Sequence, residues 1–261
     1  MTDKASDFLG ALIDKLWPVG KIYVDALQPA AREIGKGGED FAKAARLLTL
    51  PVQGAAMLQE KIDRYRARLD DQVPAERRIP IIPRLGGPLI EGLRFAEDGE
   101  LVTEFMLNLL AAAMDNKKVA DVHPAFPTIA RDLAPDEAMI LYLLKQRSYK
   151  MRYTMAYLPP GNVQPGELVW GEREIEENEF PLTRLAQPEY FTLFMDRLKM
   201  LGLAHTEGFG QQEVVHGVVN GQKRQVAVRI HAITELTDFG KLFARACVPD
   251  NLPQRIYSQR Q

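Results

Sequence analysis

The sequence predicts a mainly α (α+β) protein, with an N-terminal helical bundle and a C-terminal winged-helix-like unit that carries one β-hairpin. Apolar residues recur at three and four positions along much of the chain, which is the period of amphipathic helices. The segment EVVHGVVNGQKRQVAVRIHAIT instead alternates around Asn220-Gly221. Asn-Gly between two alternating segments is the strongest short-range signal for a hairpin. These two patterns define the predicted fold class.

Residues 1–78 form the first predicted region, a bundle of short helices. One stripe of its first helix holds Phe8, Leu9, Leu12, Ile13, Leu16 and Trp17. Pro18 and Gly20 end this helix, because neither residue favours a helix interior. Three further helices are predicted before residue 70. We expect the apolar stripes of this region to pack against one another.

Residues 79–132 form the second region, which opens on a proline-rich segment. Pro80, Pro83 and Pro88 within IPIIPRLGGP bar a continuous helix and predict an extended crossing segment at a domain boundary. The helical period resumes directly afterwards and continues to Met114. The segment DNKKVADVHP that follows is a loop by composition.

Residues 133–261 have the element order of a winged helix with an insertion at 149–179. LAPDEAMILYLLKQ is a first helix, with Asp136 and Glu137 in the turn where the helix dipole favours acids. FPLTRLA is a short second helix, and PEYFTLFMDRLKMLGL is a third that ends at Gly202. The hairpin follows as the wing, and ELTDFGKLFARACV closes the unit as a helix.

Composition bounds the function classes. The chain has 261 residues, 46% hydrophobic and 26% charged, which suits a globular protein with a sizeable core. A net charge of -2 gives no general attraction to nucleic acid. Cys247 is the single cysteine, so an internal disulfide is excluded and a reducing compartment is indicated. No apolar run reaches the ~18 residues that span a bilayer. We expect a cytoplasmic location, with peripheral attachment to the inner membrane as the alternative.

Four motifs follow each other in one order: PLIEGL, then ELVTEFMLNLLAAAMD, then VHPAF, then LAPDEAMIL. The chain ends this pattern with Leu236, Thr237, Phe239, Gly240, Phe243 and Cys247 in an L-T-x-F-G-x-x-F-x-x-x-C arrangement. From about Pro88 onward the sequence resembles the Abi-alpha (DUF4393-type) family of helical bacterial proteins associated with abortive infection. The resemblance implies a role in antiphage defence and supplies no chemistry.

His123 is the first candidate for chemistry, because Asp115 lies nearby in the sequence and Glu104 lies one helix upstream. A neutral imidazole beside carboxylates can act as a general base or a metal ligand. No second histidine or nucleophile lies at a useful spacing. We therefore favour a structural role for these family-motif residues, in which Pro124 fixes the turn and Phe126 anchors it in the core.

Other motifs of catalysis are missing from the sequence. It contains no nucleophile elbow, phosphate loop, dinucleotide fingerprint or H-E-x-x-H. The predicted hairpin could bring His216 opposite His231, but two histidines without a third ligand make a weak zinc site. Cys247 is expected to be a small buried hydrophobe. We therefore expect no enzymatic activity, no cofactor and no metal.

Two surfaces are candidates for binding. The basic residues of the winged-helix-like unit are Arg184, Lys223, Arg224 and Arg229, which suit phosphate contact better than base reading. The first helix offers a stripe for a membrane interface or a partner protein at Phe8, Leu12, Ile13, Leu16 and Trp17. Acidic residues cancel the lysines of this helix, so packing within the protein is the alternative.

The expected function is non-enzymatic antiphage defence by abortive infection. In this hypothesis the C-terminal unit recognises a protein partner, from the phage or the host or a toxin, and the N-terminal helices are then released. A homo-oligomer and contact with a membrane are further options, and nucleic acid is not favoured. The alternatives are a winged-helix DNA-binding transcriptional regulator, an immunity or antitoxin protein that masks a toxin, and an enzyme that uses His123.

Overall fold

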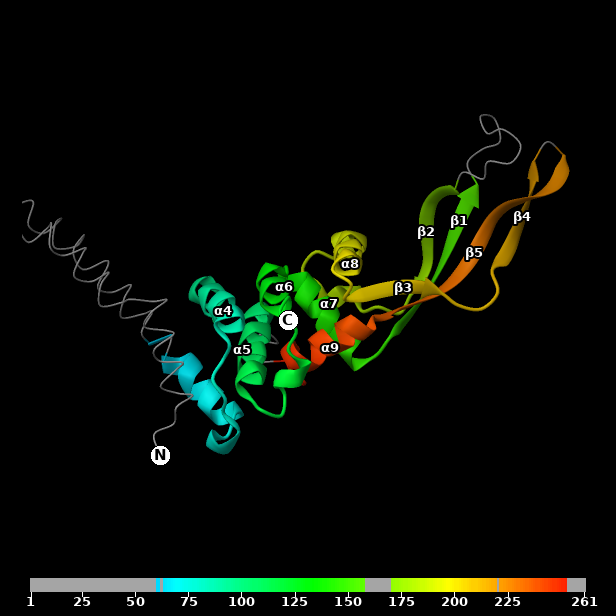
Figure 1. Ribbon diagram of the computed structural model, residues 1–261. Coiled ribbons are helices and arrows are strands. Elements are labelled where there is room, and N and C mark those ends of the chain that lie inside the picture. The colour runs from blue at the N-terminus through cyan, green and yellow to red at the C-terminus, as the bar shows by residue number, and fades with distance from the viewer. Residues whose placement is uncertain (1–59, 62, 158–169, 220, 253–261) are drawn as a thin grey trace, which may run out of the picture. The chain divides into compact units, whose positions relative to one another are not determined.

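The computed structural model describes residues 60–61, 63–157, 170–219 and 221–252 (Figure 1). The chain divides into two compact units. Unit 1 comprises the residues up to Leu133 and a second segment that begins at Pro249, and unit 2 runs from Ala134 to Val248. Most of the predicted N-terminal bundle lies outside the described residues, and of its helices only the segment from residue 60 to 72 can be followed.

Unit 1 is helical throughout its described part. Its last helix, α6, is short and begins where Phe126 is fully buried. In chain order the elements are a helix over residues 60–72, the 3-10 turn η1 (Ala75–Arg77), α4 (Pro83–Phe95), α5 (Leu101–Met114), the 3-10 turn η2 (Val119–Asp121) and α6 (Phe126–Asp132). The helices α4, α5 and α6 contact one another pairwise.

Helix α5 is the centre of unit 1. Thirteen of its 14 residues are buried, Asn108 being the exception. A helix that is apolar on all sides must be covered on all sides. Both α4 and α6 pack on it. The small residues near its end, Ala111 to Ala113, leave room for close neighbours, as does Gly92 of α4, where a methyl group would lie 2.8 Å from the sulfur of Met106.

The proline-rich segment is extended only as far as Ile82, which corrects the prediction that the helical period resumes after Pro88. Pro83 opens α4, where its missing N–H costs nothing. Pro88 lies inside α4, and one backbone hydrogen bond is lost there. Burial of Leu85, Leu89 and Leu93 on the same helix offsets that loss.

Unit 2 combines three α-helices with one antiparallel sheet. The predicted first helix is confirmed as α7, with Asp136 and Glu137 in its first turn. The predicted short second helix is only the turn η3. Its helical elements are α7 (Pro135–Gln146), the 3-10 turns η3 (Leu182–Arg184) and η4 (Pro188–Tyr190), α8 (Phe191–Met200) and α9 (Asp238–Cys247).

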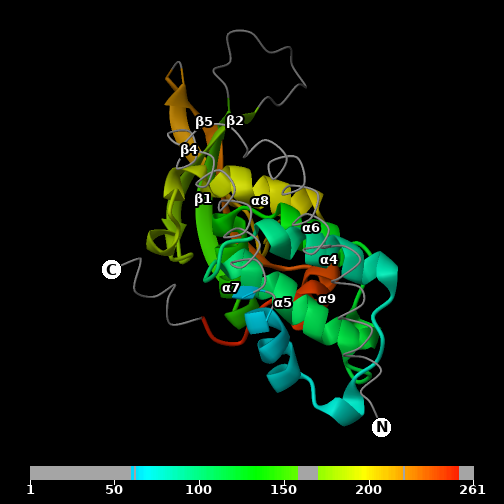
Figure 2. The same ribbon diagram turned by 90° about the vertical axis from the view of Figure 1, so that its left-hand side faces the viewer.

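The sheet has five strands in the order β2-β1-β5-β3, and β4 also pairs with β5 (Figures 1 and 2). One edge of the long strand β5 pairs with β3 along its C-terminal part and with β4 along its N-terminal part. The strands are β1 (Tyr149–Tyr157), β2 (Trp170–Asn178), β3 (Ala204–Gly208), β4 (Glu213–Val219) and β5 (Gln222–Leu236).

The predicted winged-helix-like unit with one β-hairpin is therefore wrong. The hairpin around Gly221 exists as β4 and β5, with Gly221 at a φ of 74°. However, the predicted insertion at 149–179 supplies β1 and β2, and β1 covers the other edge of β5. The segment YKMRYTMAY alternates between apolar and polar residues from Tyr149 to Met155, which is the pattern of a half-buried strand.

The two faces of the sheet differ in chemistry. The inner face is buried near the helices, because Ala232, Thr234 and Leu236 of β5 are at most 5% exposed and both α7 and α9 contact this strand. Tyr149 and Met151 of β1 are buried as well. Successive side chains of a strand point to opposite faces. The intervening polar residues therefore lie together on the outer face.

Candidate functional site

The strand register gathers charged residues on the outer face of the sheet. Arg152 of β1 lies opposite His231 of β5, and Thr154 lies opposite Arg229. Glu213 of β4 also lies opposite Arg229, on its other side. Three strands thus bring their polar side chains to one place, and β2 adds a fourth.

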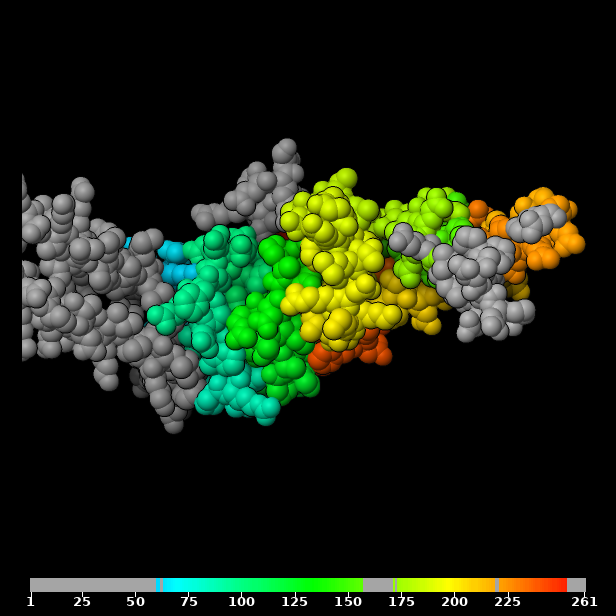
Figure 3. All heavy atoms as spheres, turned by 90° about the horizontal axis from the view of Figure 1, so that it is seen from above, coloured from blue at the N-terminus to red at the C-terminus, as the bar shows by residue number. Residues whose placement is uncertain are grey.

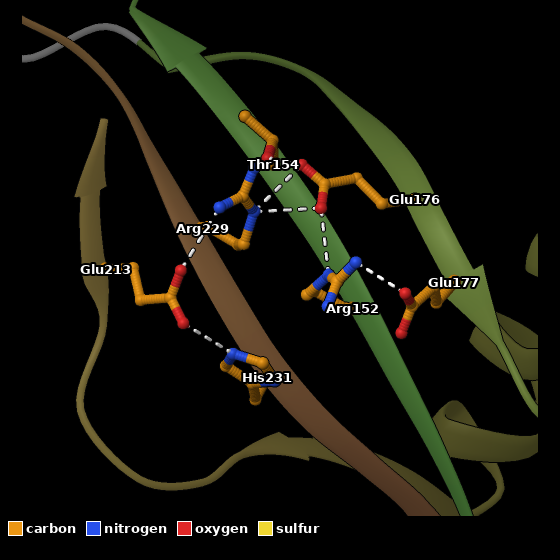
Figure 4. A network of polar contacts seen from close by, with 7 residues as sticks. All are labelled: Arg152, Thr154, Glu176, Glu177, Glu213, Arg229 and His231. Atoms are coloured by element: carbon orange, nitrogen blue, oxygen red, sulfur yellow. Dashed lines mark hydrogen bonds and ion pairs between the residues drawn. The ribbon is translucent and has the colours of Figure 1, made fainter. Parts of the chain in front are cut away.

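Glu176 of β2 is the centre of this outer-face network (Figure 4). Its carboxylate accepts hydrogen bonds from Arg229 Nε at 2.8 Å, Arg152 Nε at 2.9 Å and Thr154 Oγ1 at 2.5 Å. Arg229 Nη1 also donates to Glu213 at 3.1 Å. The network extends to two further side chains at its ends, with His231 Nε2 3.1 Å from Glu213 and Arg152 2.5 Å from Glu177.

The network keeps its carboxylates ionised. The hydrogen bond from Thr154, with those from Arg229 and Arg152, lowers the pKa of Glu176 from 4.5 to about 2. Hydrogen bonds from His231 and Arg229 lower the pKa of Glu213. Carboxylates with pKa values this far below neutral are weak general bases at pH 7. The arrangement is better suited to linking side chains of four strands than to transferring a proton.

A metal site is not formed in the described part of the chain, where no group of three or more His, Cys, Asp and Glu side chains converges. His205 of β3 comes nearest, with Glu235 at 3.6 Å and Glu207 at 3.7 Å. Glu235 is the cross-strand partner of His205 on β5, and Glu207 lies two residues along the same strand, so both contacts join neighbouring positions of the outer face.

The four basic residues predicted for phosphate contact do not form one patch of free charge. Arg229 is part of the outer-face network, with two carboxylates as partners. Lys223 and Arg224 lie at the hairpin end of β5, and Arg224 donates to Gln222. Arg184 lies in η3, away from the strands in sequence. Lys223 and Arg224 are thus separated from Arg229 along β5, and the DNA-binding alternative also loses its winged-helix fold.

The predicted family-motif residues lie in unit 1 around α5. Glu104 is 4% exposed and accepts a hydrogen bond from Arg68 at 2.7 Å, while Asp115 is 1% exposed and pairs with Arg77. Both arginines come from the segment before α4. The two carboxylates thus tie that segment to α5.

His123 lies in the turn before α6. Its Nδ1 accepts a hydrogen bond from the backbone N–H of Ala125 at 3.1 Å, and its ring centroid is 5.6 Å from that of Phe126. Pro124 beside it is exposed, and Phe126 is fully buried. These contacts are those of a turn histidine above an anchored aromatic ring.

The remaining sequence candidates are placed as follows. His216 pairs with Gln225, so it does not lie opposite His231 as the hairpin prediction suggested. Cys247 is fully buried, and burial raises the pKa of its thiol well above the usual value. The stripe of Phe8, Leu12, Ile13, Leu16 and Trp17 lies outside the described residues. Among the helices that are described, none has the length and apolar character needed to cross a bilayer.

Helix α8 presents an apolar surface that the sequence reading overlooked. Its buried side, formed by Phe191, Met195 and Leu198, faces the unit 2 core. A second stripe, which we call the α8 outer stripe, comprises Tyr190, Leu193, Phe194 and Met200. Three of these side chains are largely exposed, at 48% for Tyr190, 62% for Leu193 and 87% for Met200. The atoms of α8, yellow in Figure 3, lie on the surface of unit 2.

The spacing of the α8 outer stripe gave a signal in the sequence. Residues 190, 193, 194 and 200 recur at three, four and seven positions, as one helix face requires. The helix thus has apolar residues on two adjacent faces, and the core of unit 2 covers only the face with Phe191, Met195 and Leu198.

The family model for abortive infection alpha matches residues 57–247, which include every described helix and strand from α4 to α9. Comparison with curated proteins and with solved structures found no match. The model covers well over half of the chain and agrees with the resemblance seen in the sequence motifs. The chain therefore belongs to the abortive infection alpha family.

Proposed function

We propose that this protein protects a bacterial population from phage by a non-enzymatic route, in which unit 2 recognises a partner protein. Membership in an abortive-infection family supports the defence role. The observation that carries the recognition step is the α8 outer stripe, because large exposed side chains on one helix face mark a contact surface for another macromolecule.

The outer-face network supports a binding role over a chemical one. Its arginines are already paired with carboxylates, and the pKa values of Glu176 and Glu213 are lowered by those partners and by Thr154 and His231. A surface whose charges satisfy each other has little left to activate a substrate. It does hold side chains of four strands in one arrangement on the outer face, and a recognition surface needs such order.

The test is phage protection in cells that express the protein from its native locus with the neighbouring genes. We expect protection at a low phage dose and collapse of the culture at a high dose. The combined change Leu193→Ser and Met200→Ser should abolish protection, while the protein remains folded, because both side chains are exposed. The matched control is Val218→Ser, which changes an apolar residue that is 77% exposed on β4.

Full protection by the double variant would remove α8 from the mechanism. The release step has a separate test, because the N-terminal stripe lies outside the described residues. Deletion of residues 1–19 should abolish protection or toxicity without weakening partner binding by unit 2. If the deletion left both unchanged, the release of N-terminal helices would have no part in the function.

A further inference from the structure

We infer that the α8 outer stripe binds an amphipathic helix of a partner protein whose apolar face is bordered by lysine or arginine. This inference rests on the proposed function and names the chemistry of the partner. Two observations carry it: the exposed apolar side chains of α8, and the sign of the charges along their border.

The border of the stripe is acidic. Asp196 lies three residues after Leu193 and four before Met200, so it neighbours both on the helix surface. Glu189 lies in η4, directly before the helix begins. Both acids are exposed, and neither has an ion pair among the described residues. Two carboxylates beside an apolar stripe favour a partner with basic flanks.

The positive charge of Arg197, beside the stripe, is already paired. Arg197 follows Leu193 by one turn, and its guanidinium pairs with Glu137 of α7, whose side chain is 1% exposed. Arg197 therefore contributes its aliphatic stem to the surface while its charge is held by unit 2. Lys199 lies three residues after Asp196 and therefore neighbours it on the helix surface, on the side away from the stripe.

Part of the stripe is held in shape before any partner arrives. The rings of Tyr190 and Phe194 meet edge to face, with centroids 6.4 Å apart. Asp136 of α7 accepts hydrogen bonds from the backbone N–H groups of Ala186 and Gln187 at 2.8 Å, which fixes the segment leading into α8. A surface ordered in advance loses less entropy on binding.

The same charges disfavour other occupants. A symmetric contact between two copies of α8, centred on the stripe, would bring the two Asp196 carboxylates close together, which costs free energy. An anionic membrane surface or a nucleic acid would face the acids at positions 189 and 196. A helix with basic borders meets both the apolar stripe and its acidic edge.

The test uses the full-length protein and two labelled synthetic peptides of roughly 18 residues, about five helical turns. One peptide has a leucine face bordered by lysines, and the other has glutamates in place of the lysines. We expect the lysine peptide to bind at least about tenfold more tightly, with an affinity that falls as salt rises. Leu193→Ser with Met200→Ser should abolish this binding, and Val218→Ser should not change it.

The decisive variant reverses the border charge. Glu189→Lys with Asp196→Lys should make the protein prefer the glutamate peptide. Retention of the lysine preference in this variant would overturn the inference, as would equal binding of both peptides by the unaltered protein. Sedimentation that shows a dimer lost in the Leu193→Ser, Met200→Ser variant would also overturn it, in favour of a second copy as occupant.

These outcomes separate the inference from the proposed function. If the peptides fail to discriminate but the double serine variant still loses phage protection, recognition through α8 stands and the basic-flanked helix is wrong. If the variant loses peptide binding but keeps full protection, the surface chemistry is right and its assignment to the defence function is wrong.

Discussion

The carboxylates around α5 of unit 1 and those on the outer face of the unit 2 sheet are used in opposite ways. In unit 1, Glu104 and Asp115 are buried and each is held by an arginine from the segment before α4. In unit 2, Glu176 and Glu213 lie on an open sheet face and share partners across four strands. A buried carboxylate must keep its partner because it has no water to replace it, whereas an exposed one is screened by solvent and salt.

The buried and the exposed carboxylates therefore have different roles, the first in the stability of the fold and the second in the order of surface side chains. The buried pairs fasten α5 to the segment before it, so their loss should affect folding of unit 1. The outer-face network orders side chains whose strands are already joined by backbone hydrogen bonds. Its loss should affect the surface of the sheet more than the free energy of unfolding.

The largest expected effect is that of Arg77→Ala. This change leaves Asp115, which is 1% exposed, without its charged partner, and we expect the free energy of unfolding to fall by about 3 kcal/mol. Chemical denaturation followed by circular dichroism measures this loss. The control is Arg64→Ala, whose pair with Asp98 is far more exposed and should contribute below about 1 kcal/mol. Equal losses in the two variants would contradict the distinction between buried and exposed carboxylates.

Gly217→Ala should have a smaller, local effect. A methyl group on Gly217 of β4 would lie 2.8 Å from a methyl carbon of Val226 on β5, so the Val226 side chain or one of the two strands must shift. We expect a loss of about 1 kcal/mol, confined to the hairpin. Faster amide exchange along β4, with unchanged exchange along β3, would confirm that strand fit holds this hairpin.

Gly221→Ala is a useful comparison for the same hairpin. Gly221 has a positive φ of 74° but no atom within 4 Å of an added methyl group. Any loss in this variant therefore reports backbone strain in the turn and not a clash between strands. If only Gly221→Ala opened the hairpin, the packing of Val226 over Gly217 would be unimportant.

The sequence predicted the helices better than the sheet, for a physical reason. The helical period of α5, α7 and α8 is local, and the Asn-Gly turn marks the β4–β5 hairpin within a few residues. The pairing of β1 with β5 joins residues about 80 positions apart, and nothing local to either strand specifies it. The alternation in YKMRYTMAY was readable as a strand, but its partner was not.

The candidate sites also differ in whether the sequence alone could predict them. Glu104, Asp115 and His123 stood out in the sequence as motif residues, although their arginine and backbone partners depend on the fold. The outer-face network could not be found without the strand register, because Arg152, Glu176 and Arg229 are far apart in the chain. The α8 outer stripe was readable from spacing alone, since a helix surface is set by its own sequence.

The smallest expected effect, and the one that tests the exposed network itself, is the pH response of Glu176→Gln. The pKa of Glu176 in the folded protein is about 2, below its ordinary value of 4.5, so the folded state binds fewer protons between these values. Its contribution is therefore present above pH 4.5 and is lost as pH falls towards 2. Glu137 acts in the opposite direction, because burial raises its pKa and its carboxylate destabilises the fold as pH rises.

Removing Glu176 should thus lower the thermal midpoint slightly above pH 4.5 and leave it unchanged near pH 2, so that its fall between these pH values becomes flatter. High salt should reduce the difference between the two proteins, because the network is exposed and its charges are screened. A drop at neutral pH as large as that of Arg77→Ala would mean that the outer-face network holds the sheet together. The contrast between buried and exposed carboxylates would then fail as an account of how the two units are stabilised.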